Sequence, residues 1–189
     1  MSPQPAGGAG DPVVGGIATE RLLLRRWRPE DRAPFAAMNA DPEVMRFFLK
    51  PLNKEESLGS LASFRTAIDQ KGWGLWAVDA DGIFAGFTGL SEPAFTAHFT
   101  PCVEIGWRLR REFWGQGVAY SAALQAQAFA FDTLRLQELV SFTTAANERS
   151  RNLMQRLGFS RDPKEDFLHP RVPVDHPLRP HVLYRKKRS

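Results

Sequence analysis

Residues 103–124 read V-E-I-G-W-R-L-R-R-E-F-W-G-Q-G-V-A-Y-S-A-A-L and join a strand-like run to a helix-like run through a short loop. Apolar residues at the odd positions from Val103 to Leu109 alternate with polar or small residues, which is typical of a strand with one buried face. From Val118 onward, small residues that favour helix predict a long helix packed closely against a sheet. This stretch therefore predicts a strand, a loop and a helix in direct succession.

Two glycines, Gly115 and Gly117, lie where the strand gives way to the helix. Because glycine has no Cβ, a ligand can come close to the backbone there. The free N–H groups of the first helical turn favour a bound anion such as phosphate. We expect Arg108, Arg110 and Arg111 to add positive charge nearby.

Two familiar phosphate-binding motifs do not fit this loop. A Walker A loop ends in G-K-[ST], whereas Gly117 is followed by Val118 and Ala119. The dinucleotide-binding pattern G-x-G-x-x-G places its third glycine where this chain has Tyr120. Neither nucleotide-binding fold is predicted.

A second stretch, residues 147–159, reads N-E-R-S-R-N-L-M-Q-R-L-G-F. With both stretches in hand, the chain resembles the GNAT superfamily of acyl-CoA-dependent N-acetyltransferases, in the branch similar to the RimJ/RimL ribosomal-protein N-terminal acetyltransferases. The resemblance runs from about Thr19 to Tyr184. The coenzyme A loop of that superfamily, [Q/R]-x-x-G-x-[G/A], matches Gly117 and Ala119.

The second family motif is Asn-x-x-Ser followed by a helix that ends in Leu-Gly-Phe. It matches Asn147, Ser150 and residues 157–159. The chain departs from the family at three places. Trp114 stands where the coenzyme loop has Gln or Arg, Met154 stands where many relatives have a Tyr proton donor, and residues 120–121 read Tyr-Ser where relatives often have Thr-Glu.

The resemblance implies a mixed α+β fold. Its central, mostly antiparallel sheet of six to seven strands splays open beside the fourth strand and carries helices on both faces. It also implies acetyl-CoA as the acyl-donor substrate, an amine as acceptor, and no metal. The residues implied in coenzyme A binding are Trp107 and Leu109 through their main chains, the loop residues Trp114, Gly115, Gln116, Gly117, Val118 and Ala119, and Asn147.

Glu104 is the candidate general base for removing a proton from the acceptor amine. It lies in an apolar strand on the face opposite Val103 and Ile105, where partial burial would raise its pKa toward neutrality. The alternative is that Glu104 pairs with an arginine or faces water. Ser150, or a water held by Asn147 and Ser150, is the candidate proton donor to the leaving thiolate. The alternative for Ser150 is a helix-start residue that binds a free N–H.

Other functions remain open on the sequence. Met154 and Ser121 favour a non-catalytic module that keeps the coenzyme A site as a sensor or assembly surface, whereas Glu104, Asn147 and Ser150 favour an enzyme. The basic C-terminal run is the basis of a third interpretation, binding to ribosomal RNA or the ribosome surface. The enzyme is the preferred hypothesis, and no nucleic-acid partner is expected.

Composition predicts one domain and a reducing compartment. The chain has 189 residues, 43% of them hydrophobic, and a formal net charge of +4 from 25 basic and 21 acidic residues. We expect a flexible tail over residues 1–16, an acetyltransferase domain over residues 17–185 and a basic tail over residues 186–189. A single cysteine, Cys102, and the lack of a long apolar run predict a soluble cytoplasmic protein without a membrane partner. A homodimer is a base-rate expectation.

The remaining elements are predicted from periodicity, turn residues and caps. In chain order they are a strand over 17–27, a helix from Pro29, starting later if Pro34 disturbs it, to Asn39, a short helix over 41–48, a helix capped by Asn53 and Glu56, a hairpin turning at residues 79–82, a loop over 91–101, a strand over 138–144, a helix over 148–157 stopped by Gly158, a long loop over 160–180 and a strand over 181–185.

Overall fold

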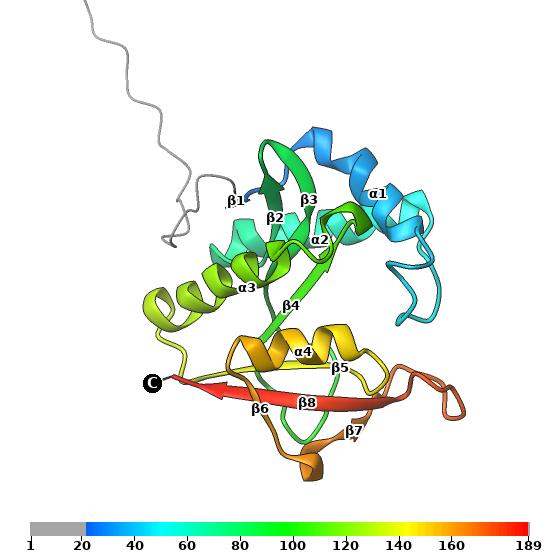
Figure 1. Ribbon diagram of the computed structural model, residues 1–189, viewed down its shortest axis with the longest axis vertical. Helices are drawn as coiled ribbons and strands as arrows, with labels where there is room; N and C mark the ends of the chain where they lie inside the picture. Colours follow the sequence, from blue (N-terminus) through cyan, green and yellow to red (C-terminus); the bar gives the residue numbers. More distant parts are fainter. Residues whose placement is uncertain (1–21, 189) are drawn as a thin grey trace, which may run out of the picture.

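An eight-stranded sheet runs through the computed structural model, which describes residues 22–188 (Figure 1). The strands are β1 (Leu22–Arg25), β2 (Leu75–Ala80), β3 (Ile83–Ser91), β4 (Glu104–Leu109), β5 (Glu138–Thr144), β6 (Ser160–Arg161), β7 (Phe167–Leu168) and β8 (Pro180–Lys187). Their order is β1-β2-β3-β4-β5-β8-β6, and β7 also pairs with β8. Every pairing is antiparallel except β4 with β5, which is parallel.

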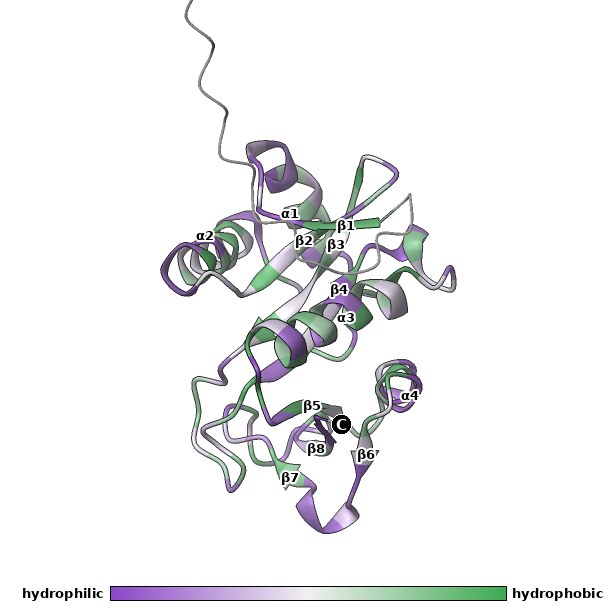
Figure 2. Ribbon diagram, turned by 90° about the vertical axis from the view of Figure 1, so that its left-hand side faces the viewer, coloured by the Kyte–Doolittle hydropathy of each residue, from purple (hydrophilic) through white to green (hydrophobic). Residues whose placement is uncertain are grey.

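Four α-helices cover the sheet on both faces. They are α1 (Arg32–Ala40), α2 (Lys54–Lys71), α3 (Val118–Ala128) and α4 (Glu148–Arg156). A π-helical turn over Phe129–Thr133 extends α3, and short 3-10 turns cover Pro29–Asp31, Arg111–Phe113 and Pro163–Glu165. In the side view α2 lies on one face of the sheet, and α3 and α4 lie on the other (Figure 2). The predicted fold class, a mostly antiparallel sheet flanked by helices, is confirmed.

Local sequence signals set the hairpin and the longest helix. Asp81 and Gly82 both have positive φ, 53° and 80°, as the mirror-image turn between right-twisted strands requires. At the start of α2, Asn53 Oδ1 accepts from the Glu56 amide at 2.8 Å, and the Asn53 amide donates to Glu56 Oε2 at 2.9 Å. The predicted turn and capping box are both confirmed.

An aromatic cluster joins α1 and α2 to the sheet. The rings of Phe35, Phe64, Phe84 and Phe87 have centroids 5.1 to 6.4 Å from that of Trp27. The indole N–H of Trp27 donates to Leu75 O at 2.7 Å, so the buried polar atom is satisfied. This packing holds β2 and β3, and through them β4, in place.

A second, smaller core lies under the loop over residues 91–101. Phe99 is buried with Val140 and Leu183, and the half-buried rings of Phe95 and Phe167 pack against them. Residues of the loop after β3 therefore stabilise the β5–β8 half of the sheet.

Three predicted elements need correction. Residues 41–48 form a turn instead of a helix, because the Met45 amide bonds back to Asp41 O but the Phe48 amide bonds to Met45 O, so the helical ladder does not continue. The predicted loop over residues 160–180 contains β6 and β7, which pair with β8. The last strand ends at Lys187 instead of residue 185, so it includes two residues that were expected in the basic tail.

The other boundaries agree closely with the expectations. β5 has the predicted limits, α4 ends one residue early, and Gly158 takes the left-handed conformation with φ 85°. α1 begins at Arg32, after a 3-10 turn, so Pro34 lies in its first turn, where a proline is tolerated. Residues 17–21 of the first predicted strand and the tail over residues 1–16 lie outside the described residues. No helix within residues 22–188 has both the length and the apolar character that crossing a membrane requires.

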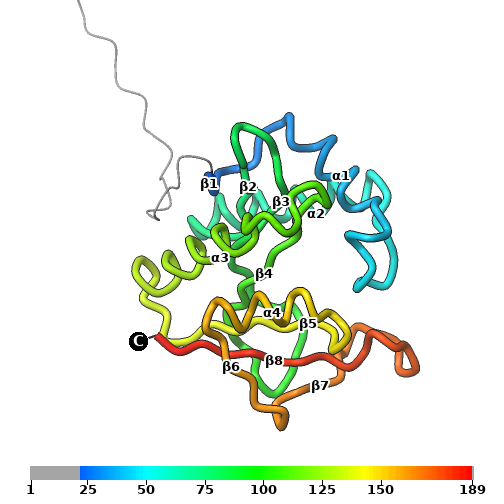
Figure 3. Tube along the Cα trace, viewed as in Figure 1, coloured from blue at the N-terminus to red at the C-terminus, as the bar shows by residue number. Residues whose placement is uncertain are grey.

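The sheet opens between β4 and β5 (Figure 3). The two strands share one register pair, Glu104 with Val140. The Val140 amide donates to Val103 O at 3.0 Å, and the next contact, at 2.9 Å, is made by the Ser141 hydroxyl to Ile105 O. Beyond this point β4 has no strand beside it on that edge.

We expect Gly89→Ala to lower the free energy of unfolding by at least about 2 kcal/mol. Gly89 has φ 148°, and an added Cβ would lie 2.1 Å from Gly74 O. Urea denaturation measures the change. Gly59→Ala is the control, because an added Cβ meets nothing within 4 Å in the exposed middle of α2, and it should stabilise by about 0.5–1 kcal/mol. Equal stability of the two variants would contradict the observed packing.

Candidate functional site

Two cavities meet at the opening between β4 and β5. The first, of about 370 Å³, lies between the start of α3, α4 and the end of β4. The second, of about 530 Å³, lies between β4, β5, the turn over residues 45–52 and the segment over residues 169–181. Both are lined by Phe47, Trp107, Arg108, Asn147 and Ser150. The shared residues make the two cavities neighbouring parts of one site.

The free edge of β4 supplies main-chain groups to the first cavity. Val103 O and Ile105 O accept bonds from the β5 side, whereas Gly106 O accepts from Thr88 on β3. Because strand backbone groups alternate in direction, the N–H and C=O groups of Trp107 and Leu109 face the side that β5 has left. Leu109 O accepts a bond there from the indole of Trp114 at 3.0 Å. The Leu109 N–H and both polar groups of Trp107 remain on the open edge.

The start of α3 offers unpaired backbone donors. Gly115 and Gly117 have φ of 73° and 78°, a region that suits glycine, and no side chain caps the helix. The first intrahelical bond runs from the Ser121 amide to Gly117 O at 3.0 Å. The amides of residues 118–120 therefore have no intrahelical acceptor, and together with the helix dipole they favour an anion.

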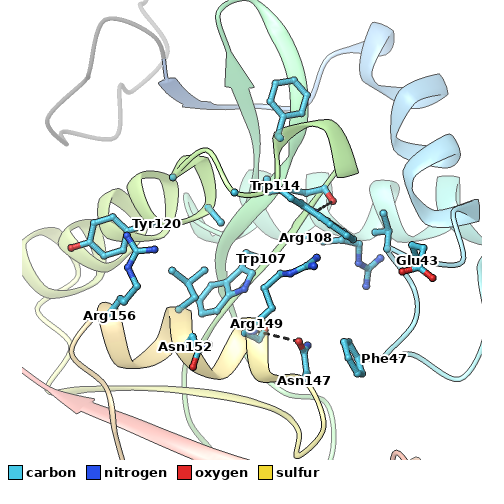
Figure 4. A pocket seen from close by; sticks show the side chains of 18 residues that line it. Glu43, Phe47, Trp107, Arg108, Trp114, Tyr120, Asn147, Arg149, Asn152 and Arg156 are labelled. Carbon is cyan, nitrogen blue, oxygen red and sulfur yellow. Dashed lines mark hydrogen bonds between the residues drawn. The ribbon is translucent and has the colours of Figure 1, made fainter.

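Trp114 supports the loop instead of presenting a polar side chain to the cavity. Its indole N–H is used by Leu109 O, and the guanidinium carbon of Arg149 lies 4.0 Å from the centre of its ring (Figure 4). An arginine on an aromatic face keeps its edge donors free for an anion. Trp114 thus fixes the position of Arg149 across the cavity.

One face of α4 supplies cations that the sequence analysis did not identify. Arg149, Asn152, Leu153 and Arg156 line the first cavity, and the Arg156 guanidinium lies 4.7 Å from the ring centre of Tyr120 on α3 (Figure 4). Their spacing of three, four and seven residues is the signal that would have placed them on one helical face.

Two of the three arginines that were expected to add charge near the loop, Arg110 and Arg111, do not line either cavity. Arg110 pairs with Glu112, and Arg111 lies 3.7 Å from Asp41. Because both guanidinium groups have carboxylate partners, their charge is largely compensated. The third expected arginine, Arg108, lines both cavities, and the other cations at the first cavity come from α4.

Most of the residues implied in coenzyme binding lie at the first cavity. Those that line it are Trp107, Leu109, Trp114, Gly115, Gly117, Ala119 and Asn147. Gln116 and Val118 do not line it. The Gln116 side chain is exposed and donates to Glu112 O, and the Val118 side chain packs against the core.

Glu104 lies in the second cavity without a cationic partner. Burial raises the pKa of its carboxyl to about 8, and a weak bond from the Ser91 hydroxyl at 3.5 Å opposes this shift. No arginine or lysine of the described chain forms an ion pair with it, so the expected alternative of an arginine pair does not hold. A carboxyl with a pKa near neutrality is suited to proton transfer.

Asn147 and Ser150 have different local roles. Asn147 Oδ1 accepts from the Ser150 amide at 3.3 Å and so caps α4, and Asn147 Nδ2 donates to Thr143 Oγ1 at 3.0 Å. The cap is therefore made by Asn147, and the alternative that Ser150 itself caps a free N–H is wrong. The Ser150 hydroxyl lines both cavities and makes no hydrogen bond to any described residue.

Two histidines far from the recognised motifs line the second cavity. The rings of His169 and His181 have centroids 4.8 Å apart. Burial lowers the pKa of both, and that of His169 falls to about 4, with further lowering from His181 and Arg171. Both are uncharged at neutral pH. His98, in the loop over residues 91–101, is exposed and lines neither cavity.

Two further features concern reactive or metal-binding groups. Cys102 is half-buried, and desolvation, followed by the charge of Glu104, raises its pKa to about 11. Its thiol is protonated at neutral pH and is therefore a poor nucleophile.

Across residues 22–188 the structure brings together no group of three or more His, Cys, Asp or Glu side chains that could hold a metal ion.

The known proteins that this chain resembles are described as acetyltransferases. Residues 21–160 match the family model described as an acetyltransferase (GNAT) domain. The chain is 31% identical over 153 residues to the FsC-acetyl coenzyme A-N(2)-transacetylase of Aspergillus fumigatus, a match that spans 76% of this chain but only 64% of that protein. Among solved structures, an acetyltransferase from Agrobacterium tumefaciens is 25% identical with a TM-score of 0.74, covering 98% of this chain and 100% of that one.

A more distant structure shares the fold. RimL, a ribosomal α-N-protein acetyltransferase solved in complex with coenzyme A, has a TM-score of 0.72 over 92% of this chain and 97% of its own, at 15% identity. At this identity the likeness concerns the arrangement of the backbone.

We expect Asn147→Ala to lower the free energy of unfolding by about 1 kcal/mol, because it removes the cap of α4. Ser150→Ala should change it by less than about 0.5 kcal/mol, because the hydroxyl has no partner to lose. Urea denaturation of the two variants beside the unmodified protein makes the comparison. A larger loss for Ser150→Ala than for Asn147→Ala would show that the capping roles are reversed.

Proposed function

Since the chain belongs to the GNAT acetyltransferase family, we propose that it transfers an acetyl group from acetyl-CoA directly to a primary amine in a ternary complex. One observation carries this proposal. The opening between β4 and β5 joins a cavity that has free helix amides and arginines to a cavity that holds a carboxyl of raised pKa. An acetyl donor and an amine acceptor can therefore meet at the edge of β4.

The residues of the first cavity fit an acyl-CoA. The uncapped amides at the start of α3, with Arg149 and Arg156 facing them, suit the pyrophosphate. The open main-chain groups of Trp107 and Leu109 suit the amides of the pantetheine arm, as an added strand would. Asn147 orders the start of α4 beside them.

Bound acetyl-CoA supplies a thioester, whose carbonyl carbon is open to attack by a neutral amine. Glu104 accepts the proton of the acceptor amine at a carboxylate oxygen, which requires that Glu104 itself be ionised. The free hydroxyl of Ser150, at the boundary of the two cavities, donates a proton to the leaving thiolate and regains one from water, to which Glu104 releases the amine proton. Met154, where many relatives have a tyrosine, is buried and has no proton to give. No acyl-enzyme is part of this proposal.

The class of acceptor follows in part from a relative. The Aspergillus protein is named as an N(2)-transacetylase, which supports a nitrogen acceptor. The RimJ/RimL-like branch supports a protein N-terminus. Both are primary or α-amines that Glu104 could deprotonate at neutral to mildly alkaline pH.

We expect acetyl-CoA and coenzyme A to bind, and Arg149→Gln and Arg156→Gln each to weaken binding about tenfold through loss of a charge-assisted bond. Isothermal titration calorimetry measures the dissociation constants. Arg151→Gln is the control, since it removes the same charge from α4 at a residue that donates to Ala145 O and does not line the cavity. Unmodified protein that fails to bind either ligand would overturn the proposed function.

We expect Glu104→Gln to lower kcat/KM at least about tenfold while the dissociation constant of acetyl-CoA stays the same. In the unmodified protein kcat/KM should rise with pH through about 8, because the raised pKa leaves Glu104 protonated below that value. The ionisation of the acceptor amine contributes to the pH profiles of the unmodified protein and of Glu104→Gln alike. Only the difference between these two profiles therefore reports the ionisation of Glu104. Identical profiles and rates would remove Glu104 from the mechanism.

A further inference from the structure

A half-buried arginine without a carboxylate partner lies at the junction of the two cavities. The Arg108 guanidinium donates from Nη1 to Asn39 Oδ1 at 2.7 Å, and this is its one hydrogen bond within residues 22–188. Its Nε is buried with no partner, and the Nδ2 of Asn39 is likewise buried without an acceptor. Burial lowers the pKa of Arg108 to about 10, yet it remains charged at neutral pH. A buried cation normally has an anionic partner.

Aromatic rings hold this guanidinium in a fixed plane. Its central carbon lies 4.2 Å from the ring centre of Phe48 and 5.2 Å from that of Phe87. Stacking leaves the N–H groups at the edge of the plane free to bind a planar carboxylate. The carboxylate of Glu43 lines the first cavity, but it forms no ion pair with Arg108.

The strand places Arg108 in line with the candidate base. Glu104, Gly106 and Arg108 share one face of β4, because side chains alternate along a strand. Glu104 Oε1 lies 3.8 Å from where a Cβ on Gly106 would be, so the carboxyl leans along the strand toward Arg108. The position between them has no side chain. This face of β4 therefore has a base at one end and a cation at the other, with space above Gly106 between them.

The charges of the second cavity have one sign at neutral pH. Among the described residues that line it, Glu104 is the single acid, and its raised pKa leaves it largely uncharged. Lys50 pairs with Glu56, and His169 and His181 are uncharged. Two lining cations without a carboxylate partner among the described residues remain: Arg171, whose exposed side chain donates to Ala94 O, and Arg108, which lies on the same face of β4 as the base. A polyamine or other polycation is repelled by such a site, whereas an anionic group is attracted.

On the basis of the proposed function, we propose that the acceptor is an amino carboxylate, whose carboxylate binds the edge of Arg108 while its amine lies toward Glu104. The guanidinium gains the bidentate partner that the chain does not give it. The proposal makes Arg108 a specificity residue for the acceptor, and it excludes polyamines and aminoglycosides as preferred substrates.

The test is steady-state kinetics with acetyl-CoA and a panel of α-, β- and γ-amino acids, each beside its carboxamide, together with spermidine. The unmodified protein should prefer amino acids to their carboxamides, and Arg108→Gln should lower that preference about 10- to 100-fold. Differences in amine pKa between an acid and its amide cancel when the two proteins are compared. Arg110→Gln, which changes an arginine that lines neither cavity, should keep the preference.

A shape-preserving variant guards against a folding defect in Arg108→Gln. Asn39→Asp would place a carboxylate against Arg108 Nη1, so the guanidinium would have an internal partner and lose its affinity for the substrate. We expect the fold to be kept and the preference for amino acids to fall at least about tenfold. If Arg108 had only a structural role, Asn39→Asp would stabilise the protein and leave its preference for amino acids over their carboxamides unaltered.

Binding provides a readout separate from turnover. N-acetyl amino acids, the products, should bind the unmodified protein in calorimetry and bind Asn39→Asp at least about tenfold more weakly, with acetyl-CoA affinity equal in both. Acetyl-CoA binding with preferred acetylation of spermidine or carboxamides, or with no acetylation across the panel, overturns the inference and leaves donor binding intact. Loss of acetyl-CoA affinity in Asn39→Asp would also overturn it, since Arg108 would then serve the donor. Absence of acetyl-CoA binding to the unmodified protein would instead defeat the proposed function itself.

Discussion

The single register pair between β4 and β5 is the constraint on which the site depends. Parallel strands normally continue side by side, and their backbone N–H and C=O groups form hydrogen bonds with one another along the whole length. Here pairing stops after Glu104 and Val140, and a serine hydroxyl takes the next carbonyl. Each part of the sheet has its own packing, because an aromatic cluster lies on one side of the opening and the Phe99 cluster lies on the other. An open polar edge is thus held inside a well-packed protein.

Strand β4 contributes to the site in two independent ways. Its free edge presents the main-chain groups of Trp107 and Leu109. These backbone groups are present whichever side chains occupy the two positions. Its face toward the second cavity presents Glu104 and Arg108 on either side of Gly106. Donor binding can therefore rest on backbone and on α4, while acceptor choice rests on side chains of the same strand. This separation explains how one fold can accept different amines without altering the donor site.

The sequence was sufficient for features that depend on neighbouring residues. The turn at Asp81 and Gly82, the cap formed by Asn53 and Glu56, and the limits of β5 all follow from local chemistry. The raised pKa of Glu104 could also be anticipated, because alternation placed it within an apolar strand. The short strands β6 and β7 could not, since two residues carry no periodicity and both exist through pairing with β8.

Residues that act across space were the other source of error. Arg149 and Arg156 reach the first cavity because α4 packs opposite α3, and the free charge of Arg108 appears only once its neighbours are known. Local sequence around the glycine loop suggested Arg110 and Arg111 instead, whose carboxylate partners lie in the loop and in the turn after α1.

Residue-resolved amide hydrogen exchange, measured by NMR with and without saturating acetyl-CoA, tests most directly whether the open edge of β4 binds the donor. If the donor binds there, exchange at the Trp107 and Leu109 amides slows at least about tenfold on binding, because they gain an acceptor. The Arg108 amide, which faces β3, should change little. Unchanged exchange at Trp107 and Leu109 in a protein saturated with acetyl-CoA would show that the donor does not bind along the open edge of β4.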